Sequence, residues 1–222
     1  MAVYLKVSET EKERLTIKSP KCIFTLSPNK SYTNTGKLKE IIISLFDVFS
    51  NVLIVNGYYN NRWNLFINKQ LDERKFEQLY IKEIDKFNKR VFSISTELGI
   101  EERISAIDWK KTLIELDYQL VYSNIREYYS TSEQFSNDLK SIAENYLLHN
   151  NKKSNLKLNY ITLSINYLIE EISMIIFLYN KGYEIEVYPG EDLSLFNNII
   201  EKIYPDFPYD LHNRKHYTII IA

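Results

Sequence analysis

Two short apolar runs, separated by a helical pattern, constrain the fold of this chain most strongly. CIFTLS at residues 22–27 and VLIVNG at residues 52–57 begin as unbroken apolar stretches, without the alternation of a half-exposed strand. Strands of a parallel sheet show this pattern because helices cover both faces of the sheet. Between the runs, apolar residues recur at the spacing of one helical face: Leu38, Ile41, Ile42, Leu45 and Phe49. The order predicts a βαβ unit.

The remainder of the chain continues this alternation. Periodicity predicts helices near residues 72–98, 109–128, 132–148, 158–179 and 193–203, and strands at residues 183–188 and 217–222. We therefore expect an α/β fold with about five mainly parallel strands and helices on both faces. Residues 1–20 are charged and end in Ser19-Pro20. We expect them to form a loosely ordered lead-in, followed by a single domain over residues 21–222.

The scarcity of glycine, cysteine and histidine excludes several chemistries. The five glycines are spaced too widely for either G-x-G-x-x-G or the phosphate loop of ATP-binding proteins. Cys22 is the only cysteine, so no internal disulfide can form, and a four-ligand zinc site would need nearly every Cys and His in the chain. His212 and His216 are four residues apart, but nearby prolines argue against a helix that would pair them. We expect neither a metal nor another cofactor.

The N-terminal residues and the longest apolar runs bear on location. Charged residues interrupt every apolar run near the N-terminus, and no segment approaches ~18 consecutive apolar residues. We therefore expect a cytoplasmic protein without a membrane segment.

Ser27 is the first candidate for chemistry. In open α/β sheets, ligands bind beyond the carboxyl ends of the strands, and Ser27 ends the first predicted strand, just before Pro28 and Asn29. A serine at this place can be presented as a nucleophile on a rigid platform. The same position also suits an ordinary turn or capping serine, and position alone does not separate the two.

Two further signals lie later in the chain. Tyr167 and Glu171 are four residues apart, hence on one face of the very apolar helix predicted at residues 158–179. A carboxyl group buried there would have a raised pKa and could move protons. Alternatively, Glu171 is a partly exposed residue at the edge of the helix, with Glu170 on the same solvated side. Tyr188 ends a predicted strand before Pro189-Gly190, a position that by itself is typical of packing.

Taken together, the order and separation of these segments resemble the cyclodipeptide synthases, which use two aminoacyl-tRNAs to make a cyclic dipeptide. The segments that carry the resemblance are LSPNKSY (26–32), INYLIEE (165–171) and VYPG (187–190). The resemblance spans about residues 21–221. It implies a Rossmann-like fold, similar to the catalytic domains of class I tyrosyl- and tryptophanyl-tRNA synthetases but without their ATP motifs.

The resemblance implies a covalent, ping-pong mechanism. Ser27 would react with the first aminoacyl-tRNA to give an aminoacyl-enzyme, which the second aminoacyl-tRNA converts to a dipeptidyl-enzyme that cyclises and leaves. Tyr167 and Glu171 would hold the α-amino group of the aminoacyl moiety, and Glu171 would also move protons. Tyr188 would orient the serine ester and relay a proton during ring closure. An aminoacyl ester is already activated, so no ATP is required.

The resemblance also implies a pocket for the first aminoacyl side chain, lined by Ile23, Thr25, Met174, Ile175 and Glu186. At Lys30 and at Tyr188-Pro189 the sequence resembles the subfamily named for an X-Tyr-Pro signature. The larger subfamily has Asn in place of Lys30 and His in place of Pro189. Many members also have glycine where Thr25 stands, so this pocket is expected to differ in shape. Glu186 would favour a polar or cationic side chain if it faces the pocket, but strand alternation leaves its direction open.

A tRNA partner requires a surface that binds phosphates. The net charge of -1 does not suggest one, yet the helix predicted at residues 72–98 carries a group of cations opposite its apolar stripe: Lys75, Lys82, Lys86, Lys89 and Arg90. Glu83 and Asp85 flank this group, so an ordinary solvated face accounts for it equally well. In the cyclodipeptide synthases the corresponding helix carries the basic patch for tRNA, which favours a role in binding.

The main hypothesis is therefore a tRNA-dependent cyclodipeptide synthase, with a monomer as the default state. One alternative is an aminoacyl-tRNA esterase or another serine hydrolase, although no histidine is placed to complete a Ser-His-acid triad. The other alternative is a module that kept the fold and binds tRNA without turnover.

Overall fold

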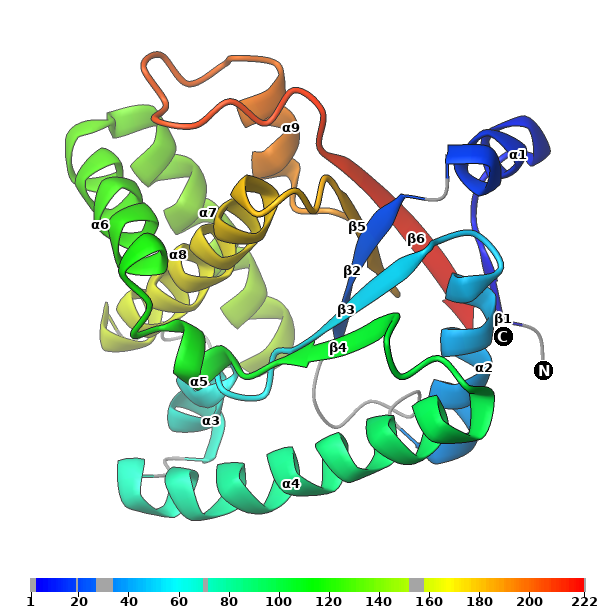
Figure 1. The fold of residues 1–222 in the computed structure, drawn as a ribbon. Helices are drawn as coiled ribbons and strands as arrows, with labels where there is room; N and C mark the ends of the chain where they lie inside the picture. Colours follow the sequence, from blue (N-terminus) through cyan, green and yellow to red (C-terminus); the bar gives the residue numbers. More distant parts are fainter. Residues whose placement is uncertain (1–2, 19, 27–33, 70–71, 152–157, 222) are drawn as a thin grey trace.

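A mainly parallel sheet of six strands forms the centre of the structure, a computed structural model that describes residues 3–18, 20–26, 34–69, 72–151 and 158–221 (Figure 1). The strand order is β1-β6-β5-β2-β3-β4. Strands β2 to β6 are parallel, and β1 is antiparallel to β6. The strands are β1 (Val3–Leu5), β2 (Lys21–Leu26), β3 (Asn51–Asn56), β4 (Ile104–Ile107), β5 (Ile185–Tyr188) and β6 (Lys215–Ile221).

Helices cover both faces of the sheet. Side chains of β2 alternate between two cores: Cys22 and Phe24 pack with α2, α4 and Leu15 of α1, whereas Ile23 packs with α6, α7, α8 and α9. Figure 1 shows α2 and α4 on one side and α6 to α9 on the other. The helices are α1 (Glu9–Lys18), α2 (Thr35–Phe46), α3 (Arg62–Lys69), α4 (Glu73–Leu98), α5 (Trp109–Thr112), α6 (Leu116–Thr131), α7 (Glu133–Asn151), α8 (Leu158–Asn180) and α9 (Ser194–Ile200).

The α/β architecture with a mainly parallel sheet is confirmed, with three differences from the sequence-based expectation. Residues 3–18 were expected to be a loosely ordered lead-in, but they form β1, which pairs with β6, and α1. Strand β4 was missed because its two central side chains are exposed, so its four residues contain no apolar run. The helix expected at residues 109–128 is interrupted and forms α5 and α6.

Local capping chemistry fixes the ends of α4. The carboxylate of Asp72 accepts a hydrogen bond from the backbone N–H of Lys75 at 2.8 Å, which satisfies a donor in the first turn. At the other end, Gly99 has a φ of 64°, the left-handed conformation that glycine adopts without steric cost. The helix predicted at residues 72–98 therefore begins and ends within one residue of its expected bounds.

Helix α8 is apolar because it is buried, and it passes through the core between the sheet and α6 and α7. By length and composition alone, residues 159–180 could span a membrane, with a mean hydropathy of 1.6, but 72% of that apolar window lies inside the fold. Burial thus accounts for the composition of α8.

A buried ion pair fastens α3 to α8. Arg62 donates two hydrogen bonds to the carboxylate of Glu170, one of them at 2.9 Å, and both side chains are almost fully buried, at 12% and 5% exposure. The guanidinium also lies 4.4 Å from the ring centroids of both Tyr59 and Trp63. Glu170 therefore does not lie on a solvated side of α8, as one interpretation of the sequence suggested.

This pair yields a prediction about stability. Glu170→Leu or Arg62→Met alone leaves one buried charge without its partner, and we expect each to lower the free energy of unfolding by about 3–5 kcal/mol. The double variant Arg62→Met/Glu170→Leu removes both charges and should be much closer to the wild type. Urea unfolding followed by circular dichroism measures the three values. A loss in the double variant equal to the sum of the two single losses would show that the two side chains do not interact.

Candidate active site

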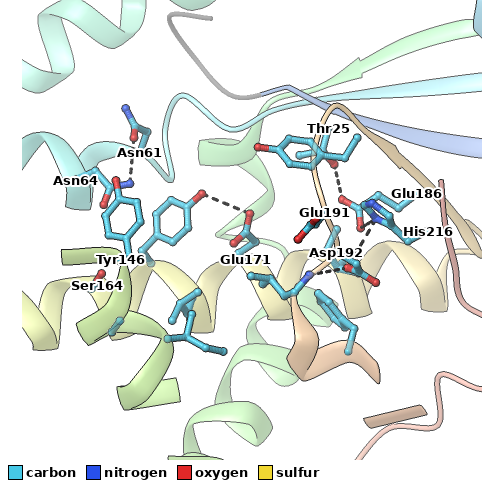
Figure 2. Close-up of a pocket in the computed structure, with 18 residues that line it drawn as sticks. Thr25, Asn61, Asn64, Tyr146, Ser164, Glu171, Glu186, Glu191, Asp192 and His216 are labelled. Carbon is cyan, nitrogen blue, oxygen red and sulfur yellow. Dashed lines mark hydrogen bonds and ion pairs between the residues drawn. The ribbon is translucent and has the colours of Figure 1, made fainter. Parts of the chain in front are cut away.

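A cavity of about 430 Å³ opens beyond the carboxyl ends of β2 and β5, between the sheet and the helices α3, α7 and α8 (Figure 2). This is the position at which parallel α/β sheets hold ligands. The sheet contributes Thr25, Glu186, Tyr188 and His216, and α8 contributes Ser164, Tyr167, Leu168, Glu171 and Ile175. The other lining residues are Asn61, Asn64, Ile142, Ala143, Tyr146, Glu191, Asp192, Leu193 and Phe196.

Tyr167 and Glu171 lie side by side on α8 and face the cavity, as their spacing predicted. The hydroxyl of Tyr167 donates to Oε1 of Glu171 at 3.4 Å, and no described cation forms an ion pair with Glu171. Burial, together with the negative charge of Glu186, raises the pKa of Glu171 to about 8. Burial and the charge of Glu171 likewise raise the pKa of Tyr167 well above its usual value. Glu171 is thus a neutral acid at pH 7 that can take part in proton transfer.

Tyr188, the last residue of β5, brings a second phenol to the same cavity. Its ring lies against Gly190, where an added Cβ would come within 2.6 Å of a ring atom. Glycine at position 190 therefore permits the close packing of the Tyr188 ring after the strand ends. The structure brings together three of the four residues predicted to be catalytic, and Ser27 lies outside the described residues.

A network of charged side chains forms one wall of the cavity, and we call Glu186, Asp192, Arg214 and His216 the charged wall. Glu186 accepts a hydrogen bond from the hydroxyl of Thr25 at 2.9 Å and one from Arg214 at 2.7 Å. Arg214 also donates to both oxygens of Asp192, at 2.6 and 2.9 Å. Nδ1 of His216 lies 3.7 Å from Asp192 and 3.9 Å from Glu186. The register of β5 and β6, which pairs Glu186 with His216, creates this proximity.

Opposite charges in the wall favour the ionised forms of Glu186 and His216. Burial opposes the charge of Glu186, but His216 and Arg214 outweigh it and lower the pKa of this carboxyl. Burial also opposes protonation of His216, and the neighbouring Glu186 and Asp192 nevertheless raise its pKa. Glu186 therefore stays charged at neutral pH, in contrast to Glu171.

Among the described residues, only Glu186, Asp192 and His216 form a group spaced to ligate a metal, with donor atoms within 4.8 Å of one another. Arg214 donates to both of these carboxylates and supplies the positive charge that a metal ion would bring. The donor set is therefore occupied by a cation of the protein itself, and a metal ion would have to displace a buried guanidinium.

The residues predicted to line the first aminoacyl pocket divide into two groups. Thr25, Ile175 and Glu186 line the cavity, so the direction of Glu186 is settled. Ile23 and Met174 do not reach it, because they are 1% and 0% exposed within the core beneath the site. Pro189 does not line the cavity, and Lys30 lies outside the described residues.

Sequence reasoning missed several residues of the site. Asn61 immediately precedes the short helix α3, and Asn64 is the third residue of this helix. The polar sequence around them gave no clear signal. His216 was weighed only as a helical partner of His212, whereas it lies on β6 next to Glu186. Arg214 and Asp192 are 22 residues apart and meet only in the folded chain. The alternation of side-chain direction along a strand was the one signal that could have indicated His216, since it places His216 and Thr218 on the same face of β6.

On α4, the predicted basic residues lie largely where the pattern put them. Four of them are exposed on the side opposite the buried stripe: Lys75, Lys82, Lys86 and Lys89. Arg90 is partly buried. Three of these lysines form ion pairs with carboxylates of the same region: Lys75 with Asp72 at 3.4 Å, Lys86 with Glu83 at 2.8 Å and Lys89 with Asp85 at 2.8 Å. The surface is therefore less positive than the lysines alone suggest.

Comparison with known proteins defines the class of fold. No protein-family model and no curated protein matches the sequence, but solved structures match across nearly all of the chain. A cyclodipeptide synthase from Fluoribacter dumoffii has a TM-score of 0.77 at 18% identity, covering 99% of this chain and 98% of that one. Another, from Mycobacterium tuberculosis, has a TM-score of 0.74 at 12% identity, covering 99% and 93%.

A third structure, a cyclodipeptide synthase from Candidatus Glomeribacter gigasporarum bound to Phe-tRNA, has a TM-score of 0.60 at 15% identity, covering 98% of this chain and 94% of that one. The Mycobacterium tuberculosis structure relates cyclodipeptide synthases to type I tRNA synthetases. The chain thus has the Rossmann-like fold of the cyclodipeptide synthases, and the resemblance inferred from the sequence is confirmed at the level of the fold.

The raised pKa of Glu171 predicts a pH dependence of stability. Between its ordinary value of 4.5 and about 8, the folded chain keeps a proton that the unfolded chain releases. The contribution of Glu171 to stability is therefore complete below pH 4.5 and is lost as pH rises to about 8, with a slope of up to about 1.4 kcal/mol per pH unit. Glu171→Gln removes this dependence. Unfolding of both proteins between pH 4 and 9 tests it, and a constant difference in stability would refute the shift.

Proposed function

We propose that this protein is a tRNA-dependent cyclodipeptide synthase, of the kind with the X-Tyr-Pro signature. The observation that carries the proposal is the meeting of Tyr167, Glu171 and Tyr188 around one cavity, in a fold shared with cyclodipeptide synthases. The sequence supports it further, since Ser27 follows Leu26, the last residue of β2, and Thr25 of the same strand lines the cavity.

The proposed reaction begins with Ser27. Its hydroxyl oxygen attacks the ester carbonyl of the first aminoacyl-tRNA, the bond to the ribose oxygen breaks, and the ribose hydroxyl leaves with the proton. The α-amino group of the resulting serine ester then attacks the ester carbonyl of the second aminoacyl-tRNA, which releases the second tRNA and leaves a dipeptide on Ser27. The free amino group of this dipeptide attacks the serine ester, closes the ring and restores the hydroxyl.

Each amine must lose a proton as it attacks, which is the task proposed for Glu171. The carboxylate form of Glu171, a minor fraction at pH 7, would bind the ammonium group, take its proton as the amine attacks and pass that proton to the departing ribose oxygen. Tyr167, hydrogen-bonded to Glu171, completes the binding site for the α-amino group. Tyr188 lies at the same cavity and orients the ester of the intermediate, relaying a proton during ring closure. The two esters supply the energy, so the proposal requires neither ATP nor a cofactor.

Aminoacyl-tRNAs are the substrates of the ribosome, and the proposal therefore places the protein in the cytoplasm. We propose that it acts as a monomer.

The covalent step gives the first functional prediction. Ser27→Ala should abolish both the cyclic dipeptide and the aminoacyl-enzyme detected by intact-protein mass spectrometry after incubation with labelled aminoacyl-tRNA. Ser31→Ala, a second serine in the same segment, serves as the control and should keep the covalent adduct. Normal output of cyclic dipeptide from Ser27→Ala would overturn the mechanism.

The same incubation with the wild-type protein separates the alternatives. Free amino acid as the only product would favour an aminoacyl-tRNA esterase. Binding of tRNA without any product, unchanged in Ser27→Ala, would favour a non-catalytic tRNA-binding module.

The basic face of α4 gives the second functional prediction. Replacing Lys82, Lys86 and Lys89 by Ala should weaken tRNA binding and make the slope of log K against log salt less steep by about 2–3, because each lost phosphate contact removes released counterions. Filter binding at several salt concentrations measures the slope. The matched control replaces three exposed lysines on α1 and α7, Lys12, Lys18 and Lys140. Equal effects of the two triple variants would refute a specific role for α4.

A further inference from the structure

The cavity has two halves that lie on either side of Glu171 (Figure 2). One half is bounded by the neutral side chains Asn61, Asn64, Tyr146 and Ser164. The other half is bounded by Thr25 and by three members of the charged wall, Glu186, Asp192 and His216. An amino acid whose α-amino group is held at Glu171 would therefore extend its side chain into one of two chemically different spaces.

The acceptor groups of the charged half are fixed in place but not saturated. Each oxygen of Glu186 accepts one hydrogen bond, from Thr25 and from Arg214 respectively, although a carboxylate oxygen can accept two. Arg214, at 2% side-chain exposure, is the member of the charged wall that does not line the cavity, and its guanidinium is packed 3.8 Å from the ring centroid of Phe196. Glu186 is thus held rigidly and can accept further hydrogen bonds, whereas Oδ1 of Asp192 already accepts two, from Arg214 and from the backbone N–H of Leu193.

The charges that face the cavity on this side are predominantly negative. Glu186, Glu191 and Asp192 line it, whereas His216 is the only basic residue among the described lining residues. A substrate carboxylate would lie beside these three carboxylates, whose negative charge Arg214 and His216 offset only in part. An aliphatic side chain would displace water from buried carboxylates without replacing its hydrogen bonds, at a cost of about 1–3 kcal/mol for each group left unpaired.

Apolar residues also line the cavity near the charged wall. Leu193 follows Asp192, and the ring of Phe196 packs against the Arg214 guanidinium; Ile175 of α8 lines the same cavity. A side chain with an apolar stem and a donor at its tip matches this combination, since its methylene groups can pack on these residues while its N–H groups reach the carboxylates.

We infer that the charged half of the cavity selects an amino acid whose side chain ends in a nitrogen donor, either an amide or a cation, and rejects aliphatic and acidic side chains. This inference rests on the proposed function, since it names the class of aminoacyl group that the site would accept. Glu186 is the principal specificity-determining residue, because it belongs to the wall, faces the cavity and is fixed by Thr25 and Arg214.

The test charges one tRNA with Gln, Lys, Leu or Glu in separate preparations, so that only the aminoacyl group differs. Acyl-enzyme and cyclic dipeptide are then quantified by mass spectrometry. The wild type should react with the Gln or Lys ester at least tenfold faster than with the Leu ester, and slowest with the Glu ester. Equal or faster reaction with Leu or Glu would overturn the inference while leaving the proposed function intact. Absence of reaction with all four esters would count against the proposed function itself.

A double variant tests the residues. Glu186→Leu/Arg214→Met replaces a buried ion pair by apolar side chains and leaves His216 as the remaining cationic partner of Asp192. It should shift the ratio of Leu to Gln reaction by at least tenfold toward Leu. Glu186→Gln, which keeps the shape of the side chain, should shift the ratio in the same direction by less, and it provides the answer if the double variant does not fold.

The matched control is Arg62→Met/Glu170→Leu, which removes a buried ion pair of the same composition that does not line the cavity. Its ratio of Leu to Gln reaction should equal that of the wild type. An unchanged ratio in both Glu186 variants, or an equal shift in the control, would overturn the assignment of specificity to Glu186.

Discussion

The burial of α8 against the sheet is the constraint on which the site depends. This helix is apolar enough to fill the centre of the fold, yet it carries two adjacent glutamates into the interior with opposite outcomes. Glu170 meets Arg62 and becomes half of a structural ion pair. Glu171, on the next face of the helix, meets Tyr167 and the negative charges of the neighbouring wall. Because no described cation pairs with Glu171, burial raises its pKa despite the hydrogen bond from Tyr167, and under the proposed function it would carry a proton.

The contrast between Glu171 and Glu186 shows how one cavity holds two carboxyl groups in different states. Arg214 and His216 keep Glu186 ionised, and its negative charge in turn helps to keep Glu171 protonated. Removing the charged wall would therefore affect Glu171 as well as the shape of the cavity. Environments that push the pKa values of two neighbouring acids apart are characteristic of sites that transfer protons.

The strands and helices with strong local patterns were predictable from the sequence, whereas those that depend on distant partners were not. The unbroken runs of β2 and β3 and the periodicity of α4 and α8 are properties of short segments. Strand β1 exists because Val3 pairs with Ile221 at the other end of the chain, and no local pattern encodes that contact. The same distinction holds in the site. The spacing of Tyr167 and Glu171 on one helix placed them together in advance, but only the register that pairs Glu186 with both Ile23 and His216 fixed the direction of Glu186.

The net charge of -1 and the paired lysines of α4 bear on the binding of tRNA that the proposed function requires. A phosphate that approaches Lys86 or Lys89 must compete with Glu83 or Asp85 for the same ammonium group. Exposed pairs of this kind are worth only about 0.3–0.5 kcal/mol, so phosphates can displace them, but each contact then yields little net free energy. Binding through α4 would therefore be weak and largely independent of tRNA sequence, since lysines contact the backbone. Discrimination among aminoacyl-tRNAs would fall mainly to the cavity, where fixed and buried groups make a mismatched side chain far more costly than a lost surface contact.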